Sequence, residues 1–282
     1  MPLPRFILSA AVRSSRWTGV DADARTYLEQ VEAQDGQQLE PAVISAVSAF
    51  VVGLKTDGLW SKIAGMCVFG GARTVSGAAV PLRGPAINLY PSGSIQATTP
   101  WTHSRRNGLR GIAVQAPTTP RRWLDSGVSH AGLGQNDVHV ATWMSALPDT
   151  ISFGTALIGV NTGTVTGSTR IQLRNEANGR NAAVVLTASS EYQSVGQAPV
   201  GLIGATRNNP SSFITRVGSA DVPFNATSQS PRSGNVQVFS SEDSSSTDAT
   251  LFYYSIGQHI DLAAMDGRVN TLRNAILAAI PA

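Results

Sequence analysis

Residues 201–217 read GLIGATRNNPSSFITRV, and this stretch carries the pattern that decides the fold class. Two short apolar runs, 201–206 and 213–217, flank a cluster of Asn, Pro and Ser that is typical of a turn. Each run has the length of a strand, and neither shows the spacing of an amphipathic helix. The stretch therefore predicts two strands joined by a short loop.

The same pattern recurs through the second part of the chain. Further short runs of β-branched or alternating residues are separated by Gly, Pro, Asn or Ser clusters, and they cover 138–144, 156–160, 169–174, 182–186, 235–239 and 250–256. Asn178-Gly179 and Ser233-Gly234-Asn235 match hairpin connections. We therefore expect residues 72–257 to form an antiparallel sandwich of the jelly-roll or concanavalin-like type, and the protein to be mainly β.

Helical patterns precede the predicted sandwich. Asp21 can cap a first helix that stops at Gly36, and Pro41 can begin a second one. The second helix has apolar residues at helical spacing, namely Val43, Ile44, Val47, Phe50, Val51 and Leu54. A third short turn at 59–63 leads to an apolar run at 66–69. Residues 21–71 are therefore predicted to be a compact helical module.

The two ends of the chain show different patterns. Pro2 and Pro4 disfavour a helix, so residues 1–20 are predicted to form an extended docking arm. Asp261 can cap a C-terminal helix within 258–282. Its apolar stripe either packs on the rest of the protein or makes a subunit contact in a trimer.

Composition limits the class of protein. No apolar run reaches the ~18 residues of a membrane span, so no membrane insertion is expected. The single cysteine, Cys67, allows no internal disulfide and indicates a reducing folding compartment. The net charge of +3 is modest, and a nucleic-acid partner is not expected.

The basic residues are unevenly placed. No acidic residue lies between Asp57 and Asp125, whereas that interval carries Lys62, Arg73, Arg83, Arg105, Arg106, Arg110, Arg121 and Arg122. Either these side chains pair with acids elsewhere in the fold or on a neighbouring subunit, or they bind an anionic partner such as an acidic glycan, a phosphate or a nucleic acid.

Motifs for catalysis are absent from the sequence. The four histidines have no ligand spacing, and His139 has the pattern of a satisfied histidine within a strand. There is no nucleophile elbow, phosphate loop or nucleotide fingerprint, and no cofactor is expected. Glu176 and Glu191 each stand alone, so no carboxylate pair for glycoside hydrolysis is visible. We therefore expect no catalytic residues and a non-enzymatic protein, with hydrolysis as a third hypothesis because pairing in space is not visible in a sequence.

Two sets of residues are candidates for binding. Trp101 follows Pro100 and lies near Arg105 and Arg106, so with Tyr192 it is a candidate for stacking on sugar rings, although a packing role is the alternative. Glu242, Asp243 and Asp248 lie in a polar loop whose oxygens could hold Ca²⁺, although a solvated loop is the alternative.

Several segments together resemble a known family. They are YLEQVEAQDGQQLE (27–40), AFVVGLKTDGLW (49–60), GART (71–74) and AVPL (79–82), followed by NGL (107–109), RWLD (122–125), NDVHVA (136–141), GLIGATR (201–207) and FYYSIG (252–257). This set resembles virion proteins of tailed bacteriophages, in which a helical module precedes a lectin-like sandwich of the laminin-G/concanavalin type. The similarity begins near residue 21 and covers nearly all of the following chain.

The resemblance implies a structural protein of the virion, assembled in the cytoplasm of the bacterial host. In the leading hypothesis it is a tail-fibre or baseplate component that docks on other virion proteins through the arm and helices. It would bind host-surface polysaccharide through sandwich loops, with a trimer as the favoured oligomer and multivalent avidity. The alternative is a capsid decoration or cement protein without glycan binding. The resemblance carries over no catalytic residue.

Overall fold

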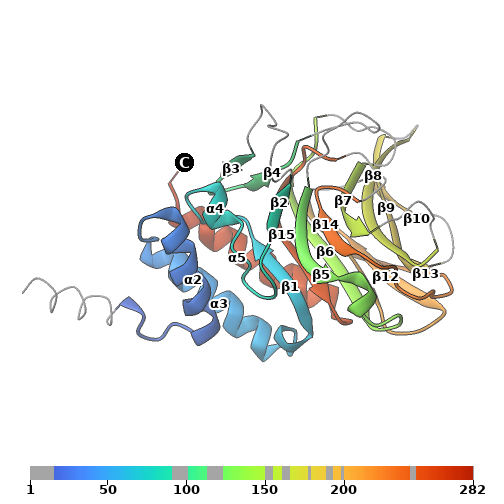
Figure 1. Cartoon of the computed structure of the whole chain (residues 1–282), viewed down its shortest axis with the longest axis horizontal. Coiled ribbons are helices and arrows are strands. Elements are labelled where there is room, and N and C mark those ends of the chain that lie inside the picture. Colours follow the sequence, from blue (N-terminus) through green and yellow to red (C-terminus); the bar gives the residue numbers. More distant parts are fainter. Residues whose placement is uncertain are drawn as a thin grey trace, which may run out of the picture.

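The computed structural model describes residues 16–90, 101–112, 123–149, 155–160, 166–176, 179–188, 193–197, 200–241 and 246–281. Two antiparallel sheets face each other, and helices cover the outer side of one of them (Figure 1). The predicted fold class, a mainly β antiparallel sandwich with helices before and after it, is confirmed.

Sheet A lies between the helices and sheet B. Its order is β13-β12-β11-β6-β15-β4-β3, and β1 also pairs with β15. Its strands are β1 (Ile63–Val68), β3 (Thr102–Ser104), β4 (Gly108–Arg110), β6 (Val138–Ala146), β11 (Gly201–Arg207), β12 (Ser212–Val217), β13 (Ala220–Asn225) and β15 (Thr250–Gly257).

Sheet B has the order β10-β9-β8-β7-β14-β5-β2. Its strands are β2 (Asn88–Tyr90), β5 (Trp123–Ser129), β7 (Thr155–Val160), β8 (Ser168–Glu176), β9 (Gly179–Ala188), β10 (Gln193–Gln197) and β14 (Asn235–Val238). Alternate side chains of the two sheets meet in a buried apolar core, in which Leu124 and Val238 of sheet B face residues such as Val140 and Ile203 of sheet A.

The two strands predicted at 201–217 are β11 and β12, and they pair directly, with Ile203 opposite Val217. At the end of β11, Arg207 is fully buried and donates hydrogen bonds to the carbonyl oxygens of Leu186, Asn209 and Ala226. Burial lowers the pKa of its guanidinium to about 10. This arginine joins the ends of three segments of the sandwich, a role that the sequence pattern did not indicate.

Among the described residues, the helical layer is formed by α2 (Ala22–Asp35), α3 (Pro41–Thr56), α4 (Val75–Ala78) and α5 (Leu262–Ala279), with the short turn η1 (Trp60–Lys62). A second short turn, η2 (His130–Gly132), connects β5 to β6 in the sandwich. The predicted caps are confirmed, since Asp21 and Asp261 accept hydrogen bonds from the first-turn amides of α2 and α5. Gly36 ends α2 with a φ of 69°, a left-handed conformation that favours glycine.

One carboxylate connects α2 to the turn that begins α4. Asp35 accepts hydrogen bonds from the backbone N–H groups of Arg73 and Thr74, at 2.7 and 2.8 Å, and from the Thr74 hydroxyl. A side chain on Gly77 would collide with this carboxylate. These contacts join residues 33–36 (AQDG) to residues 71–74 (GART), so both segments belong to the helical region although they are far apart in the sequence.

The structure differs from the sequence prediction in two places. Residues predicted to end the helical module form β1, which pairs with β15 inside sheet A. Both faces of β1 are buried, so it lacks the alternation of a half-exposed strand. In the predicted arm, Trp17 and Val20 pack against the helical core, while residues 1–15 lie outside the described residues. The division of the chain at residues 71/72 stays a prediction.

The C-terminal stripe packs within the molecule. Met265, Val269 and Ile276 of α5 are buried against α3 and sheet A, which is the packing alternative predicted for this helix. A subunit contact in a trimer stays a prediction. None of the described helices has the length and apolar character needed to span a membrane.

Candidate functional site

The predicted glycan-binding residues make contacts within the fold. The ring of Trp101 packs edge-on against Phe239, with centroids 5.2 Å apart, at the margin of the inter-sheet core. Arg105 pairs with Glu40 and donates to the carbonyl oxygen of Gly71. Arg106 donates to the carbonyl oxygen of Ile280 at 2.7 Å. Arg105 and Arg106 thus join the sandwich to the helical layer, whereas Trp101 packs within the sandwich. Tyr192 lies outside the described residues. The roles of these four residues in ligand binding stay a prediction.

The basic interval is largely paired inside the molecule. Arg73 and Arg105 share Glu40, at N–O distances of 2.7 and 2.5 Å. Arg83 donates to the carbonyl oxygen of Ile63 at 2.7 Å, and Arg110 pairs with Asp149 and Asp248. Of the two alternatives, pairing with acids within the fold holds for Arg73, Arg105 and Arg110, whereas Arg83 is bonded to a carbonyl oxygen.

Replacing Glu40 by Gln is expected to lower the free energy of unfolding by about 1–2 kcal/mol. The two arginines hold the pKa of Glu40 at about 2, and the carboxylate is only partly exposed, so neutralising it leaves two guanidiniums without their counter-charge. Urea unfolding at pH 7 measures the change. The control is Glu29→Gln, which removes the exposed pair with Arg25 and is expected to change stability by less than about 0.5 kcal/mol. Equal effects of the two substitutions would contradict the special role of Glu40.

The predicted calcium loop is only partly described. Asp248 accepts hydrogen bonds from Arg110 and from the backbone N–H of Asp149, whereas Glu242 and Asp243 lie outside the described residues. Within the described part of the chain, no group of three or more His, Cys, Asp or Glu side chains could hold a metal ion. Calcium binding therefore stays a prediction.

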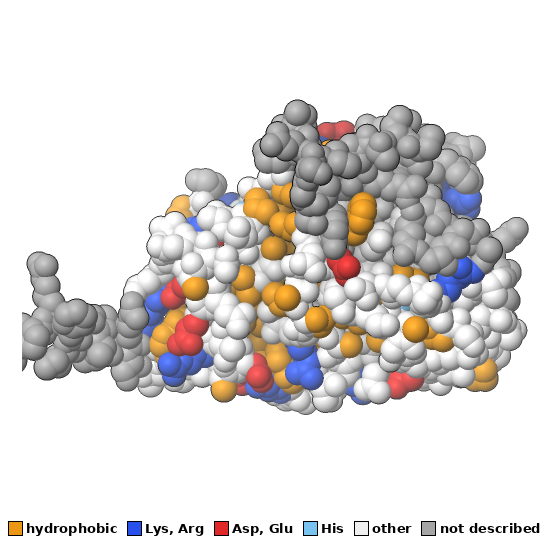
Figure 2. All heavy atoms as spheres, viewed as in Figure 1, with side chains coloured by type: hydrophobic (Ala, Val, Ile, Leu, Met, Phe, Trp, Pro, Cys, Tyr) orange, Lys and Arg blue, Asp and Glu red, His pale blue; other side chains and the backbone are white. Residues whose placement is uncertain are grey.

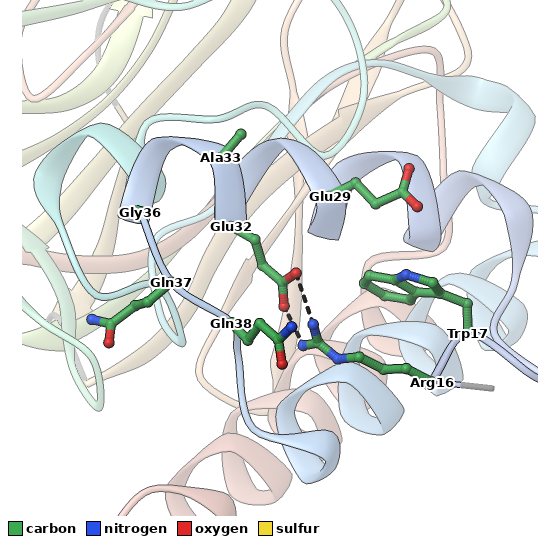
Figure 3. Close-up of a pocket in the computed structure, with 8 residues that line it drawn as sticks. All are labelled: Arg16, Trp17, Glu29, Glu32, Ala33, Gly36, Gln37 and Gln38. Atoms are coloured by element: carbon green, nitrogen blue, oxygen red, sulfur yellow. Dashed lines mark hydrogen bonds and ion pairs between the residues drawn. The ribbon is translucent and has the colours of Figure 1, made fainter. Parts of the chain in front are cut away.

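A hollow of about 440 Å³ lies where the described chain begins (Figure 3). Arg16 forms a two-pronged ion pair with Glu32 and donates to the carbonyl oxygen of Leu39, whose own N–H donates to Glu32 at 2.7 Å. The Arg16 guanidinium lies 5.0 Å from the centre of the Trp17 ring. The charged groups of the hollow thus fasten the start of the described chain to α2.

A second group of polar side chains lies on the outer side of sheet B, and we call it the sheet B corner. It comprises Asn88, Trp123, Asp125, Asn235 and Gln237. Asn88 lies directly opposite Asp125, and Asp125 lies directly opposite Gln237, so the three residues form a row across β2, β5 and β14. Their neighbours Leu124 and Val238 are buried in the inter-sheet core, which places the row on the opposite, outer face.

Hydrogen bonds hold the middle of this row in place. The Asp125 carboxylate accepts from the backbone N–H of Gly127 at 2.8 Å and from the Asn235 amide at 3.2 Å. Trp123 is two residues before Asp125 and therefore lies on the same face. The corner thus presents a fixed carboxylate between two side-chain amides, with an indole beside them. The sequence prediction missed this group because its members come from three separate strands.

The comparisons with known proteins assign this chain to no family. No protein-family model and no curated protein matches the chain. Similar solved structures include domain 4 of AbnA, a GH43 extracellular arabinanase from Geobacillus stearothermophilus, in complex with arabinotriose. It has 11% identity and a TM-score of 0.38, and the match covers 73% of this chain and 97% of that domain.

Two further similar structures are larger proteins. The Trypanosoma rangeli sialidase in complex with sialic acid has 8% identity and a TM-score of 0.41, over 76% of this chain and 33% of that one. The enzymatically active domain of tailspike protein 2 from bacteriophage CBA120 has 14% identity and a TM-score of 0.36, over 60% of this chain and 27% of that one. This chain therefore spans about a third of the sialidase and about a quarter of the tailspike domain.

The predicted function is corrected by this comparison. The sequence predicted a non-enzymatic structural protein, whereas the similar structures are mostly glycosidases and an enzymatically active tailspike domain. We therefore withdraw both the non-enzymatic assignment and the purely structural role. At these identities and TM-scores the likeness assigns no reaction or substrate to this chain.

Proposed function

We propose that this chain is a saccharide-binding component of a tailed-phage particle and that the sheet B corner is its binding face. The observation that carries the proposal is the row Asn88–Asp125–Gln237, which lies beside Trp123 on the outer side of sheet B. The resemblance of the chain to phage virion proteins supports its assignment to a phage particle.

The chemistry of the corner suits a sugar. The hydroxyl groups of a sugar both donate and accept hydrogen bonds, and a carboxylate between two amides offers both kinds of partner. Side chains directly opposite each other on neighbouring strands lie about 5 Å apart at their Cβ atoms, so several of them can reach one sugar unit. An indole adds an apolar surface that can pack on a sugar ring. Because Asp125 is already held by two donors, little ordering is needed on binding.

The test is to measure binding of bacterial surface polysaccharides by calorimetry, with the full chain and with the double variant Asn88→Ala/Gln237→Ala. Both side chains lie on the outer face, so the variant is expected to stay folded and to lose at least about tenfold in affinity, or about 1.4 kcal/mol. The matched control, Gln37→Ala/Gln38→Ala, removes two amides from the Arg16 hollow and is expected to bind as the wild type does.

Absence of binding to every polysaccharide in the panel, or equal affinity of the double variant and the wild type, would contradict the proposal. Assaying the same mixtures for new reducing ends distinguishes binding alone from binding with cleavage.

A further inference from the structure

A groove adjoins the sheet B corner and runs between α2 and residues 79–89. Its larger part, a hollow of about 510 Å³, is lined in part by Asn88, which also belongs to the corner. Its smaller part, of about 250 Å³, contains Trp60 and shares Gln30 and Pro81 with the larger part. The corner and the two hollows therefore follow one another along the surface. Figure 2 shows hydrophobic side chains gathered on this face between the helices and the sandwich.

The two walls of the groove differ in chemistry. One wall is a row of polar side chains on α2, spaced three or four residues apart and therefore on one face of the helix, namely Asp23, Thr26, Gln30 and Gln34. The opposite wall of the larger hollow is mainly apolar, with Ala79, Val80, Pro81, Ile87 and Leu89. The hydroxyl groups of a sugar need polar partners, whereas the face of its ring packs on apolar surface. A groove with one wall of each kind offers both contacts to a sugar unit.

The smaller hollow contains a cation that is held in place. Arg83 donates to the carbonyl oxygen of Ile63 at 2.7 Å, and its guanidinium lies 4.9 Å from the centre of the Trp60 ring. The segment before it is tied to β1, because the N–H of Leu82 donates to the carbonyl oxygen of Met66 at 2.9 Å. A guanidinium carries five N–H donors, of which the Ile63 contact uses one. Arg83 can therefore donate to sugar hydroxyls with little ordering on binding.

We propose that this chain binds an extended saccharide of three or more linked units, an inference that rests on the proposed saccharide-binding function. One unit lies at the sheet B corner, the next lies in the larger hollow between α2 and β2, and a further unit lies beside Arg83. The observation that carries the inference is the position of Asn88, which belongs to the corner and to the wall of the groove. A site for a single terminal sugar would use the corner without the groove.

Calorimetry with fragments of two lengths tests the proposal on the full chain. The probes have one and six sugar units and are prepared by partial acid hydrolysis of the polysaccharide that the wild type binds. We expect the six-unit fragment to bind at least about tenfold more tightly, or about 1.4 kcal/mol. The variant Gln30→Ala/Gln34→Ala removes two exposed amides from the α2 wall, and Ser76→Trp places a large ring at an exposed position in the larger hollow. Each is expected to remove most of the tenfold gain and to bind the one-unit fragment as the wild type does.

The matched control is Gln37→Ala/Gln38→Ala, which removes two amides from the Arg16 hollow and is expected to keep the full gain with length. The corner variant Asn88→Ala/Gln237→Ala is expected to weaken both fragments. If it does, but the two fragments bind equally well or the groove variants bind six units as the wild type does, this inference is wrong and the proposed function stands.

The remaining outcomes are distinct from these. If the corner variant binds both fragments as the wild type does, or if no polysaccharide binds, the proposed function fails and this inference fails with it. If Ser76→Trp lowers the molar mass of the chain in light scattering and leaves its affinity for six units unchanged, the groove joins copies of the chain and the inference is overturned.

Discussion

Lowering the pH from 7 to 4 is expected to destabilise the fold by several kcal/mol, because two buried histidines remain neutral in the folded state. His139 is fully buried in β6, where its Nδ1–H donates to the carbonyl oxygen of Gln258 and its Nε2 lies 3.1 Å from the Ser255 hydroxyl. His130 is also fully buried, between the Arg232 carbonyl oxygen and the Thr169 hydroxyl. Burial lowers the pKa of each imidazole to about 4.

The direction of this pH dependence follows from the pH at which the folded and the unfolded chain each take up protons. Between pH 6.5 and 4 the unfolded chain protonates these histidines and the folded chain does not, so stability falls as the pH falls through this window and is complete above it. A depression of this size corresponds to roughly 3 kcal/mol for each histidine at the lower end of the window. Glu40, whose pKa is lowered to about 2, acts in a second window, because its contribution is present above pH 4.5 and is lost between 4.5 and 2.

Urea unfolding at pH 7, 6, 5 and 4.5 measures this dependence. The double variant His130→Gln/His139→Gln cannot titrate at these sites, so its free energy of unfolding is expected to vary much less over the same range, even if it is less stable at pH 7. If the wild type and the double variant lose stability in parallel, groups other than these two histidines are responsible.

The sequence predicted the elements that local chemistry defines. The caps at Asp21, Gly36 and Asp261 depend on residues within one turn of each helix end, and the strands at 201–217 depend on short runs bounded by turn residues. β1 was missed for the opposite reason. It is buried on both faces, so its apolar run has the pattern of a buried helix as much as that of a strand.

The candidate site could not be predicted because it depends on register between strands that are far apart in the chain. Nothing local to Asp125 indicates that Asn88 and Gln237 lie directly beside it. The partners of the arginines could not be predicted for the same reason. Arg105 was a candidate for sugar binding because it lies near Trp101 in the sequence, and its actual partner, Glu40, lies 65 residues earlier. Pairing in space, which decides whether a charge is free, is not encoded in local spacing.

Replacing Phe50 by Ala is expected to lower the free energy of unfolding by about 3–5 kcal/mol. Phe50 is 3% exposed and meets the ring of Tyr253 edge-on, with centroids 6.2 Å apart, so truncation leaves a cavity between α3 and sheet A. Urea unfolding at pH 7 measures the loss. The matched control is Val52→Ala on the same helix, where the side chain is 47% exposed and a change within about 0.5 kcal/mol is expected. Similar midpoints for the two variants would show that Phe50 does not fill the contact between the helix and the sheet.

The shape of the same unfolding curves tests the division of the chain. One apolar core contains Phe50 of α3, Tyr253 of β15 and Met265 of α5, so helices and sheet A share buried surface. We therefore expect Phe50→Ala to shift a single transition, seen alike by far-ultraviolet circular dichroism and tryptophan fluorescence. An early separate transition of the helical signal would instead support an independent unit at 21–71. In that case the strand β1 would have to leave sheet A while the rest of the sandwich stayed folded, and a cooperative sheet makes this costly because β1 pairs with β15 along most of its length.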